Sequence, residues 1–305
     1  MVGQSTLIIY DSIEYFIPHF KNAGFQIFNT LRKIGFFQKV LRKFCFKIGI
    51  FKDYWFDING KVDWANIKTV VIFASKHPSP INYIRRINPD IRIIYYYWNP
   101  VDKIGKDNYP ESWCEKWSFD PEDCLKYGMH FNSTFYFKTI KLPKGEIEYD
   151  VVFLGVDKGR RNLLEEIQQS LKTQKFQTFF HIVDDNWNQR NYKGNNPPMN
   201  YALYLKLVAQ SRAILDFVQI GQNGLTVRTM EALFFKKKLI TNDRNIKQMD
   251  FYHPNNIFIL GEDKQKDLND FLNQPFCEVD QDVVDSYEVR NWMNAFFRLE
   301  ESKQL

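Results

Sequence analysis

Short apolar runs alternate with helical patterns along most of the chain. Runs rich in β-branched and aromatic residues predict buried strands at 6–10, 69–74, 91–97, 149–154, 179–183, 213–218 and 238–241. Between these runs, the spacing of apolar residues predicts helices at 81–87, 163–171, 201–210 and 226–235. Strands that alternate with helices in this way are typical of βαβ units and parallel sheets. The sequence therefore predicts an α/β fold.

One long interruption of this alternation divides the chain. Residues 99–144 contain four prolines and no clear periodicity, so we expect surface loops and the crossing between two domains there. A chain of 305 residues also has the length of two domains. We expect one domain at 1–145, a second at 146–285 and a terminal helix at 286–305, each domain being doubly wound.

Composition and cysteine usage exclude several classes of protein. Hydrophobic residues make up 44% of the chain and charged residues 25%, which excludes a disordered or fibrous protein. The four cysteines form no CxxC pair, so we expect free thiols in a reducing compartment. No secretory signal pattern and no run of about 18 apolar residues is present. We therefore expect a protein that is cytoplasmic or lies at the cytoplasmic face of a membrane.

The segment 216–243 carries the first candidate binding site. A strand is followed by a glycine-containing loop, and a helix begins near Thr226. Backbone N–H groups at such a helix start form an anion site, and glycine lets a ligand approach closely. Arg228 and Glu231 share one face of this helix, where they are suited to a diphosphate and to ribose hydroxyls respectively. A surface salt bridge between them is the alternative.

The turn after the strand at 149–154 is the second candidate. Residues 155–161 read Gly-Val-Asp-Lys-Gly-Arg-Arg and lie between a strand and a helix, where α/β folds place phosphates. The turn has no GxGxxG or GK[ST] motif, which disfavours a dehydrogenase and an NTPase. Lys158, Arg160 and Arg161 provide positive charge for a diphosphate leaving group. A basic turn that only caps the helix is the alternative.

These two segments resemble the donor-binding region of bacterial GT-B glycosyltransferases of capsule and lipopolysaccharide biosynthesis. In that family a glycine-containing turn enters a helix with a glutamate that binds the nucleotide ribose, and Glu231 stands in its place. The chain departs from the pattern at Asn223, where the family often has a second acid. The resemblance covers mainly residues 149–260.

The resemblance implies two Rossmann-like domains that face a cleft, with an acceptor-side domain at 1–145 and a nucleotide-sugar-binding domain at 146–285. It also implies that the helix at 286–305 packs back on the first domain. The expected donor-binding residues are Gly155, Lys158, Arg160, Arg161, Gln222, Gly224, Thr226, Arg228 and Glu231.

We expect no metal and no cofactor besides the nucleotide sugar, which is a co-substrate. The five histidines are far apart in the sequence. Asp184 and Asp185 suggest an acidic metal site, but they lie in a polar loop where aspartate is a common turn former. Protein cations are expected to act in place of a metal.

A catalytic base is expected from the N-terminal domain. Asp11 directly follows the first strand, at the carboxyl edge where such sites lie, and Glu14 and His19 follow within two helical turns. A carboxylate or an imidazole there can deprotonate an acceptor hydroxyl. For Asp11, capping of the first helix is the alternative.

Residues 20–52 form a basic and aromatic stretch. No acid occurs from Tyr15 to Lys52, and within residues 20–52 eight Lys and Arg residues are interleaved with eight phenylalanines. This pattern suits an anionic membrane surface or a charged glycolipid acceptor; a solvated helix face and nucleic-acid binding are the alternatives. Nucleic acid is not expected, because no recognised binding module is present.

Together these features predict a glycosyltransferase that moves a sugar from a nucleotide-sugar donor to a saccharide or glycolipid acceptor in bacterial surface polysaccharide synthesis. The alternative is a non-catalytic peripheral membrane scaffold with a GT-B-like fold.

Overall fold

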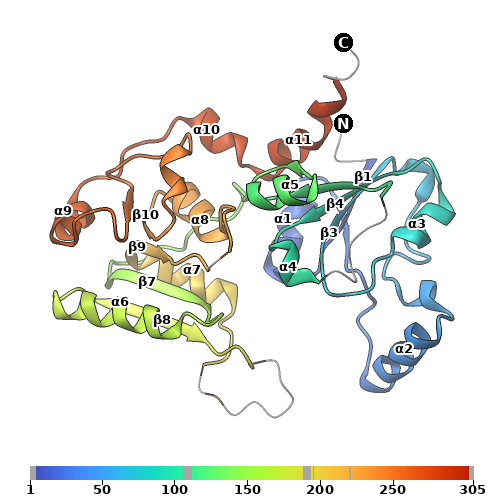
Figure 1. Ribbon diagram of the computed structural model, residues 1–305, viewed down its shortest axis with the longest axis horizontal. Helices are drawn as coiled ribbons and strands as arrows, with labels where there is room; N and C mark the ends of the chain where they lie inside the picture. Colours follow the sequence, from blue (N-terminus) through green and yellow to red (C-terminus); the bar gives the residue numbers. More distant parts are fainter. Residues whose placement is uncertain (1–4, 106–111, 188–193, 195, 220, 302–305) are drawn as a thin grey trace. The chain divides into compact units, whose positions relative to one another are not determined.

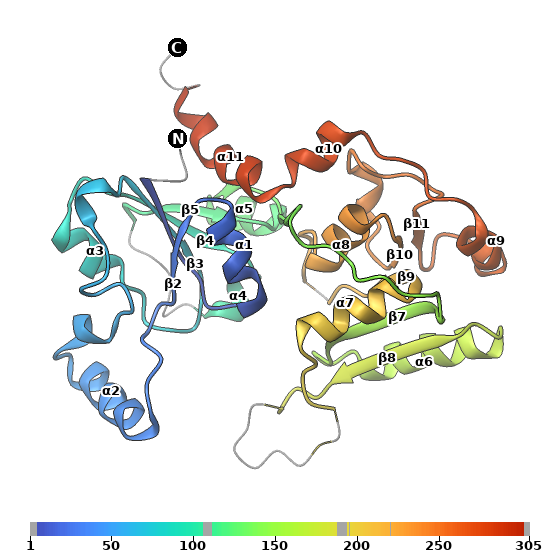
Figure 2. The same ribbon diagram turned by 180° about the vertical axis from the view of Figure 1, so that it is seen from behind.

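The computed structural model describes residues 5–105, 112–187, 194, 196–219 and 221–301, with the side chains of 299–301 excepted. The chain forms two compact units (Figures 1 and 2). Unit 1 comprises Met1–Ser133 and Trp292–Leu305, and unit 2 comprises Thr134–Asn291. Residues 302–305, part of the expected terminal helix, lie outside the described residues.

Among its described residues, unit 1 forms a six-stranded parallel sheet in the order β2-β1-β3-β4-β5-β6. The strands are β1 (Thr6–Ile9), β2 (Gln26–Phe28), β3 (Thr69–Phe73), β4 (Arg92–Tyr97), β5 (Glu115–Ser118) and β6 (His130–Phe131). The helices are η2 (Glu14–Phe16), α1 (Ile17–Asn22), α2 (Phe36–Ile48), η3 (Lys52–Trp55), η4 (Trp64–Asn66), α3 (Ile81–Ile87), α4 (Val101–Ile104), α5 (Pro121–Tyr127) and most of α11 (Val289–Glu301).

Both faces of the unit 1 sheet are buried, since successive side chains of a strand point to opposite faces and every residue of β1 and β3 is buried. On one face, Leu7, Val70 and Ile93 pack in a cluster with Ile81 and Ile84 of α3. Burial on both faces is what a parallel sheet requires, and it explains why these strands are continuous apolar runs in the sequence.

The other face is covered in part by α11. Trp292 and Phe296 are fully buried, and their rings pack at 5.0 and 5.8 Å from the ring of Tyr96 on β4. The indole of Trp292 also donates a hydrogen bond of 2.7 Å to the Ser133 carbonyl. Trp292, Met293 and Phe296 of α11 therefore belong to the core of unit 1.

The expectation that 99–144 is irregular is wrong in part. It contains α4, β5, α5 and β6, and the two strands extend the unit 1 sheet. Each strand is short and has few β-branched residues, so the local pattern was weak. Asp120 caps α5 by accepting a hydrogen bond from Glu122 N, with Pro121 at the first helical position.

Unit 2 contains, among its described residues, a five-stranded parallel sheet in the order β11-β10-β9-β7-β8. The strands are β7 (Tyr149–Val156), β8 (Thr178–Val183), β9 (Ser211–Asp216), β10 (Lys238–Thr241) and β11 (Ile257–Ile259). The helices are α6 (Arg161–Thr173), α7 (Tyr201–Ala209), α8 (Val227–Phe235), η6 (Asn245–Gln248), η7 (Gln265–Asp267), α9 (Leu268–Asn273) and α10 (Gln281–Ser286).

The unit boundaries lie at 133/134 and 291/292, whereas the sequence suggested 145/146 and 285/286. Residues after Ser133 join unit 2 through specific bonds. The Thr134 hydroxyl donates to the Leu225 carbonyl, and Tyr136 N donates to the Tyr287 carbonyl. The predicted α/β class, with two parallel doubly wound sheets, is confirmed. Within the described part of the chain, no helix has both the length and the apolar character to cross a bilayer.

Candidate functional site

The strand order of unit 2 indicates where a ligand binds. β7 lies between β8 and β9, so the chain continues from β7 to one side and later returns on the other. Such a switch point leaves a crevice at the carboxyl ends of the two central strands. The crevice is bordered by residues 157–160 after β7 and by the loop that leads from β9 to α8.

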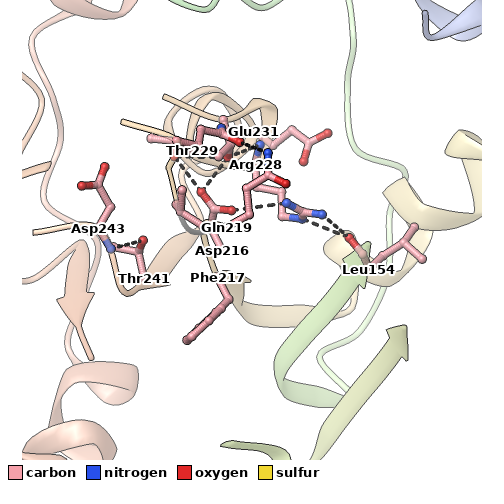
Figure 3. Close-up of polar contacts among 12 residues, drawn as sticks. Leu154, Asp216, Phe217, Gln219, Arg228, Thr229, Glu231, Thr241 and Asp243 are labelled. Atoms are coloured by element: carbon pink, nitrogen blue, oxygen red, sulfur yellow. Dashed lines mark hydrogen bonds and ion pairs between the residues drawn. The ribbon is translucent and has the colours of Figure 1, made fainter. Parts of the chain in front are cut away.

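Arg228 reaches this crevice from the first turn of α8. Its Nε and Nη2 atoms donate hydrogen bonds of 3.0 and 2.7 Å to the carbonyl of Leu154 on β7. Figure 3 shows the side chain extending from the helix to Leu154, past Asp216 at the end of β9. Arg228 therefore ties α8 to β7, and its side chain keeps 20% of its surface exposed.

Arg160 reaches the same place from the turn after β7. It is 8% exposed, and its guanidinium donates hydrogen bonds to the Val156 and Phe217 carbonyls. The buried Nε atom of Arg160 has no hydrogen-bond partner among the described residues. Burial and, second to it, the positive charge of Arg228 lower the pKa of Arg160 to about 10. Arg160 still carries its charge at neutral pH.

Both guanidinium groups lie over one ring. The Cζ atoms of Arg160 and Arg228 are 5.6 and 5.2 Å from the ring centroid of Phe153, which is almost completely buried. A ring face attracts cations but cannot neutralise them. The pair is therefore a concentration of positive charge at the switch point.

Asp216 is the buried counter-ion of this pair, a role that the sequence pattern did not indicate. Its Oδ1 lies 3.3 Å from Nη1 of Arg228, and its Oδ2 accepts hydrogen bonds of 2.6 and 3.1 Å from the Thr226 and Thr229 hydroxyls. Asp216 is shared between the two guanidinium groups, and the charges of Asp157 and Asp185 also act on Arg160. The signal in the sequence was a strand-terminal aspartate ten residues before the helix cap.

Gly155 makes room for Arg228. A Cβ atom at this position would lie 2.3 Å from Nη2 of Arg228 and 3.0 Å from the Phe153 ring. The glycine was predicted to contact the donor; here it allows a guanidinium to lie against β7.

The charged side chains of the turn at 157–161 have different partners. Asp157 accepts hydrogen bonds from the backbone N–H groups of Arg160 and Arg161, and it pairs with the Arg161 side chain at 3.2 Å. A second ion pair of 2.7 Å joins Arg161 to Asp184. Arg161 therefore stabilises the turn rather than facing the crevice with Arg160.

The acidic pair after β8 also binds this turn. The backbone N–H of Lys158, which has a left-handed φ of 52°, donates a hydrogen bond of 2.8 Å to Asp185. The Lys158 side chain is exposed. Among the described residues, no group of three or more His, Cys, Asp or Glu side chains is arranged to hold a metal ion.

The start of α8 is already capped by the protein. Thr226 accepts hydrogen bonds of 3.1 and 3.2 Å from the N–H groups of Arg228 and Thr229. In the preceding loop, Gln222 donates to the Gly224 carbonyl and accepts from Gln219. The predicted anion site at this helix start therefore depends on the arginine side chains more than on those two N–H groups.

Glu231 lies in a buried tyrosine network. It is 1% exposed, and its two carboxylate oxygens accept hydrogen bonds from the Tyr201 and Tyr204 hydroxyls, the second at 2.5 Å. The Tyr136 hydroxyl extends the network to Tyr201 at 2.6 Å. Burial raises the pKa of Glu231 to about 7. Ribose binding by Glu231 stays a prediction, and it would require exchanging a tyrosine hydrogen bond for a ribose one.

A groove begins beside the crevice, on the face of the sheet that carries α6. It has a volume of about 440 Å³ and is lined by residues including Phe217, Asn242 and Leu260, which directly follow β9, β10 and β11 respectively. This volume is in the range of small-molecule sites. Phe217 connects the two features, because its carbonyl accepts the Arg160 hydrogen bond and its side chain lines the groove.

Asp11 lies at the corresponding switch point of unit 1, between β1 and β3. Its carboxylate accepts hydrogen bonds of 2.9 Å from Thr30 N and 3.5 Å from the Ser75 hydroxyl. Ile13, rather than Asp11, occupies the N-cap position of η2, so the alternative of helix capping is wrong. Asp11 joins the loops after β1, β2 and β3.

Glu14 and His19 have other surroundings. Glu14 is exposed and pairs with Lys33, and the His19 ring packs 5.4 Å from the Tyr15 ring. Burial lowers the pKa of His19. Asp11 contacts residues after both β2 and β3, whereas Glu14 contacts Lys33 after β2.

No protein-family model and no curated protein sequence matches the chain. Among solved structures, the chain is similar to the DNA-modifying enzyme β-glucosyltransferase, with a TM-score of 0.50, 13% identity, and 95% of this chain and 98% of that chain covered. The structure of TarM is also similar, with a TM-score of 0.47, 10% identity, and 76% of this chain and 54% of that chain covered. The chain thus spans about half the length of TarM.

The likeness to β-glucosyltransferase extends over almost the whole of both chains. Together with the two doubly wound parallel sheets, it confirms the fold class predicted from the sequence: two Rossmann-like α/β domains of the GT-B type.

Proposed function

We propose that the protein is a metal-independent glycosyltransferase that transfers a sugar from a nucleotide-sugar donor to a saccharide or glycolipid acceptor. The observation that carries this proposal is the convergence of Arg160 and Arg228 at the switch point of unit 2. The solved β-glucosyltransferase is described with uridine diphosphoglucose as its substrate, which favours a nucleotide sugar as the donor here.

The proposed chemistry follows from the charges. An acceptor hydroxyl forms a new bond to the anomeric carbon, the bond from that carbon to the diphosphate breaks, and a nucleoside diphosphate leaves. The leaving diphosphate gains negative charge, which the guanidinium groups of Arg160 and Arg228 stabilise. The nucleoside lies in the groove that begins at Phe217. The hydroxyl proton passes to a general base, for which Asp11 is our candidate.

The biological setting follows from the resemblance of residues 149–260. In this proposal the acceptor belongs to a bacterial surface polysaccharide, and the protein acts at the inner face of the cytoplasmic membrane. No cofactor besides the nucleotide sugar takes part.

Calorimetry with a panel of nucleoside diphosphates and monophosphates tests the proposal. We expect one diphosphate to bind, and we expect Arg160→Gln and Arg228→Gln each to weaken its binding by about ten- to a hundredfold, because each loses a charge-assisted hydrogen bond. Arg244→Gln, which changes an exposed arginine of the same unit, is the matched control.

Absence of nucleotide binding in the folded wild-type protein would contradict the proposal. If the protein bound vesicles but no nucleotide, the alternative of a non-catalytic peripheral membrane scaffold would be favoured. Diphosphate binding that is unchanged in both arginine variants would place the donor elsewhere.

A further inference from the structure

Helix α2 of unit 1 exposes a wide apolar surface. Figures 1 and 2 show that it protrudes from the body of unit 1. The exposed fractions of its large apolar residues are 67% for Phe36, 86% for Phe37, 55% for Val40, 53% for Leu41, 57% for Phe44 and 46% for Ile48. At 100° per residue these six positions fall within one arc of the helix, which we call the apolar arc.

The opposite side of α2 holds the helix on its own unit. Cys45 is buried, and the ring of Phe46 packs 6.0 Å from that of Phe56. The Arg42 guanidinium donates a hydrogen bond of 3.0 Å to the Arg32 carbonyl. Because these contacts fix the rotation of the helix, the apolar arc faces outward.

The chain beyond the helix continues the same surface. Gly49 ends α2 with a φ of 83°, and Phe51 follows with a φ of 50° and 75% of its surface exposed. By contrast, Phe20 and Phe25 from the same basic stretch are buried in unit 1. Residues 20–52 were expected to face an anionic membrane surface or a charged acceptor. The exposed part that fits this expectation is residues 36–51.

Positive charges border the apolar arc. Lys39, Lys43 and Lys47 recur every four residues, so they line one edge of α2, and all three are exposed. No acidic residue lies between Tyr15 and Lys52 to neutralise them. An outward face with phenyl rings and one cationic edge complements the boundary between acyl chains and anionic headgroups.

We propose that α2 and Phe51 form a membrane-binding element that lies in the interface of an anionic lipid bilayer. The rings of Phe36, Phe37, Phe44 and Phe51 enter the boundary of the acyl chains, and the three lysines contact lipid phosphates. A second copy of this chain fits less well, because it would present the same cationic edge and no acid to pair with it. This inference does not depend on glycosyl transfer.

Flotation with phosphatidylcholine vesicles that contain phosphatidylglycerol, against vesicles of phosphatidylcholine alone, tests this element. We expect binding to the anionic vesicles at low salt and release at high salt. Phe37→Ser with Phe44→Ser should reduce binding at least tenfold. Both residues are exposed, so the fold should survive, and Leu125→Ser, which changes an 87% exposed residue of the same unit, is the matched control.

The contribution of charge is tested separately. Replacing Lys39, Lys43 and Lys47 with glutamine should weaken binding to anionic vesicles by up to roughly a hundredfold. Lys68, Lys103 and Lys126 are exposed lysines of the same unit. Replacing these three with glutamine should have little effect on binding to anionic vesicles. Unchanged vesicle binding in the double phenylalanine variant would overturn the proposal. So would self-association of the wild type that the same variant abolishes, without any vesicle binding, since the arc would then be a dimer interface.

Discussion

Arg160 comes from the turn after β7 and Arg228 from the first turn of α8, yet their guanidinium groups lie over the same Phe153 ring, at 5.6 and 5.2 Å from its centroid. Two like charges held this close raise each other's free energy, and burial adds to the cost for Arg160. Asp216 neutralises the positive charge of the two arginines only in part. Its carboxylate pairs with Arg228 at 3.3 Å and accepts its other hydrogen bonds from the hydroxyls of two threonines. A bound diphosphate would lower the free energy of this arrangement.

The first prediction concerns turnover. Arg228→Ala should lower kcat for sugar transfer by about 10²–10³, because a charge that stabilises the leaving diphosphate is removed. The measurement is the initial rate with the sugar derivative of the diphosphate that binds in calorimetry. Arg244→Ala, at an exposed position of the same unit, should keep the wild-type rate. Full activity in Arg228→Ala would contradict the proposal that Arg228 stabilises the leaving diphosphate.

The second prediction concerns the space at Gly155. Gly155→Ala should displace Arg228, because the new Cβ would lie 2.3 Å from its Nη2 atom. Diphosphate binding should weaken about as much as in Arg228→Ala, and the double variant should be no weaker than either single variant. Gly35→Ala is the control, since a Cβ there meets no atom within 4 Å. Additive losses in the double variant would show that Gly155 acts independently of Arg228.

The third prediction concerns pH and stability. Burial raises the pKa of Glu231 from 4.5 to about 7, so the folded state binds this proton more tightly than the unfolded state. The free energy of unfolding should therefore fall as pH rises from about 4.5 through about 7, by at most roughly 3 kcal/mol from this group.

Urea unfolding near pH 5 and near pH 8 measures this effect. Glu231→Gln cannot titrate, so its stability should fall less than that of the wild type over this interval. Glu146→Gln, at an exposed position, should retain the wild-type pH dependence. Identical pH dependence in wild type and Glu231→Gln would show that Glu231 does not hold the proton.

The fourth prediction separates donor binding from transfer. Asp11→Asn should leave the Kd for the nucleoside diphosphate near the wild-type value, because Asp11 lies in unit 1, and should lower kcat by about 10²–10⁴ through loss of the general base. Glu14→Gln and His19→Asn are expected to retain transfer. Circular dichroism must show that Asp11→Asn keeps its fold, since its side chain also accepts a hydrogen bond from Thr30 N. If Asp11→Asn is active and His19→Asn is not, the base is His19.

Local patterns determined most of the secondary structure. The run at 238–241 and the helix at 81–87 coincide with β10 and α3, because a strand buried on both faces must be apolar throughout and a helix must present one apolar face. The same reasoning failed at β5 and β6. Their few residues join the sheet through pairing with neighbours, and no local periodicity records such pairing.

The candidate site also has features that the sequence predicts and features that it does not. A glycine, a basic turn and an arginine on a helix could be found from the sequence, because strand ends and helix starts are locally coded. The tertiary structure decided the partners: Arg160 and Arg228 meet over Phe153, whereas Arg161 pairs with Asp157 and Asp184. It also buried Glu231 among tyrosines and turned Phe36, Phe37 and Phe44 of α2 outward. Residue type determines which contacts are chemically possible, and only the packing of distant segments determines which partner and which exposure each side chain has.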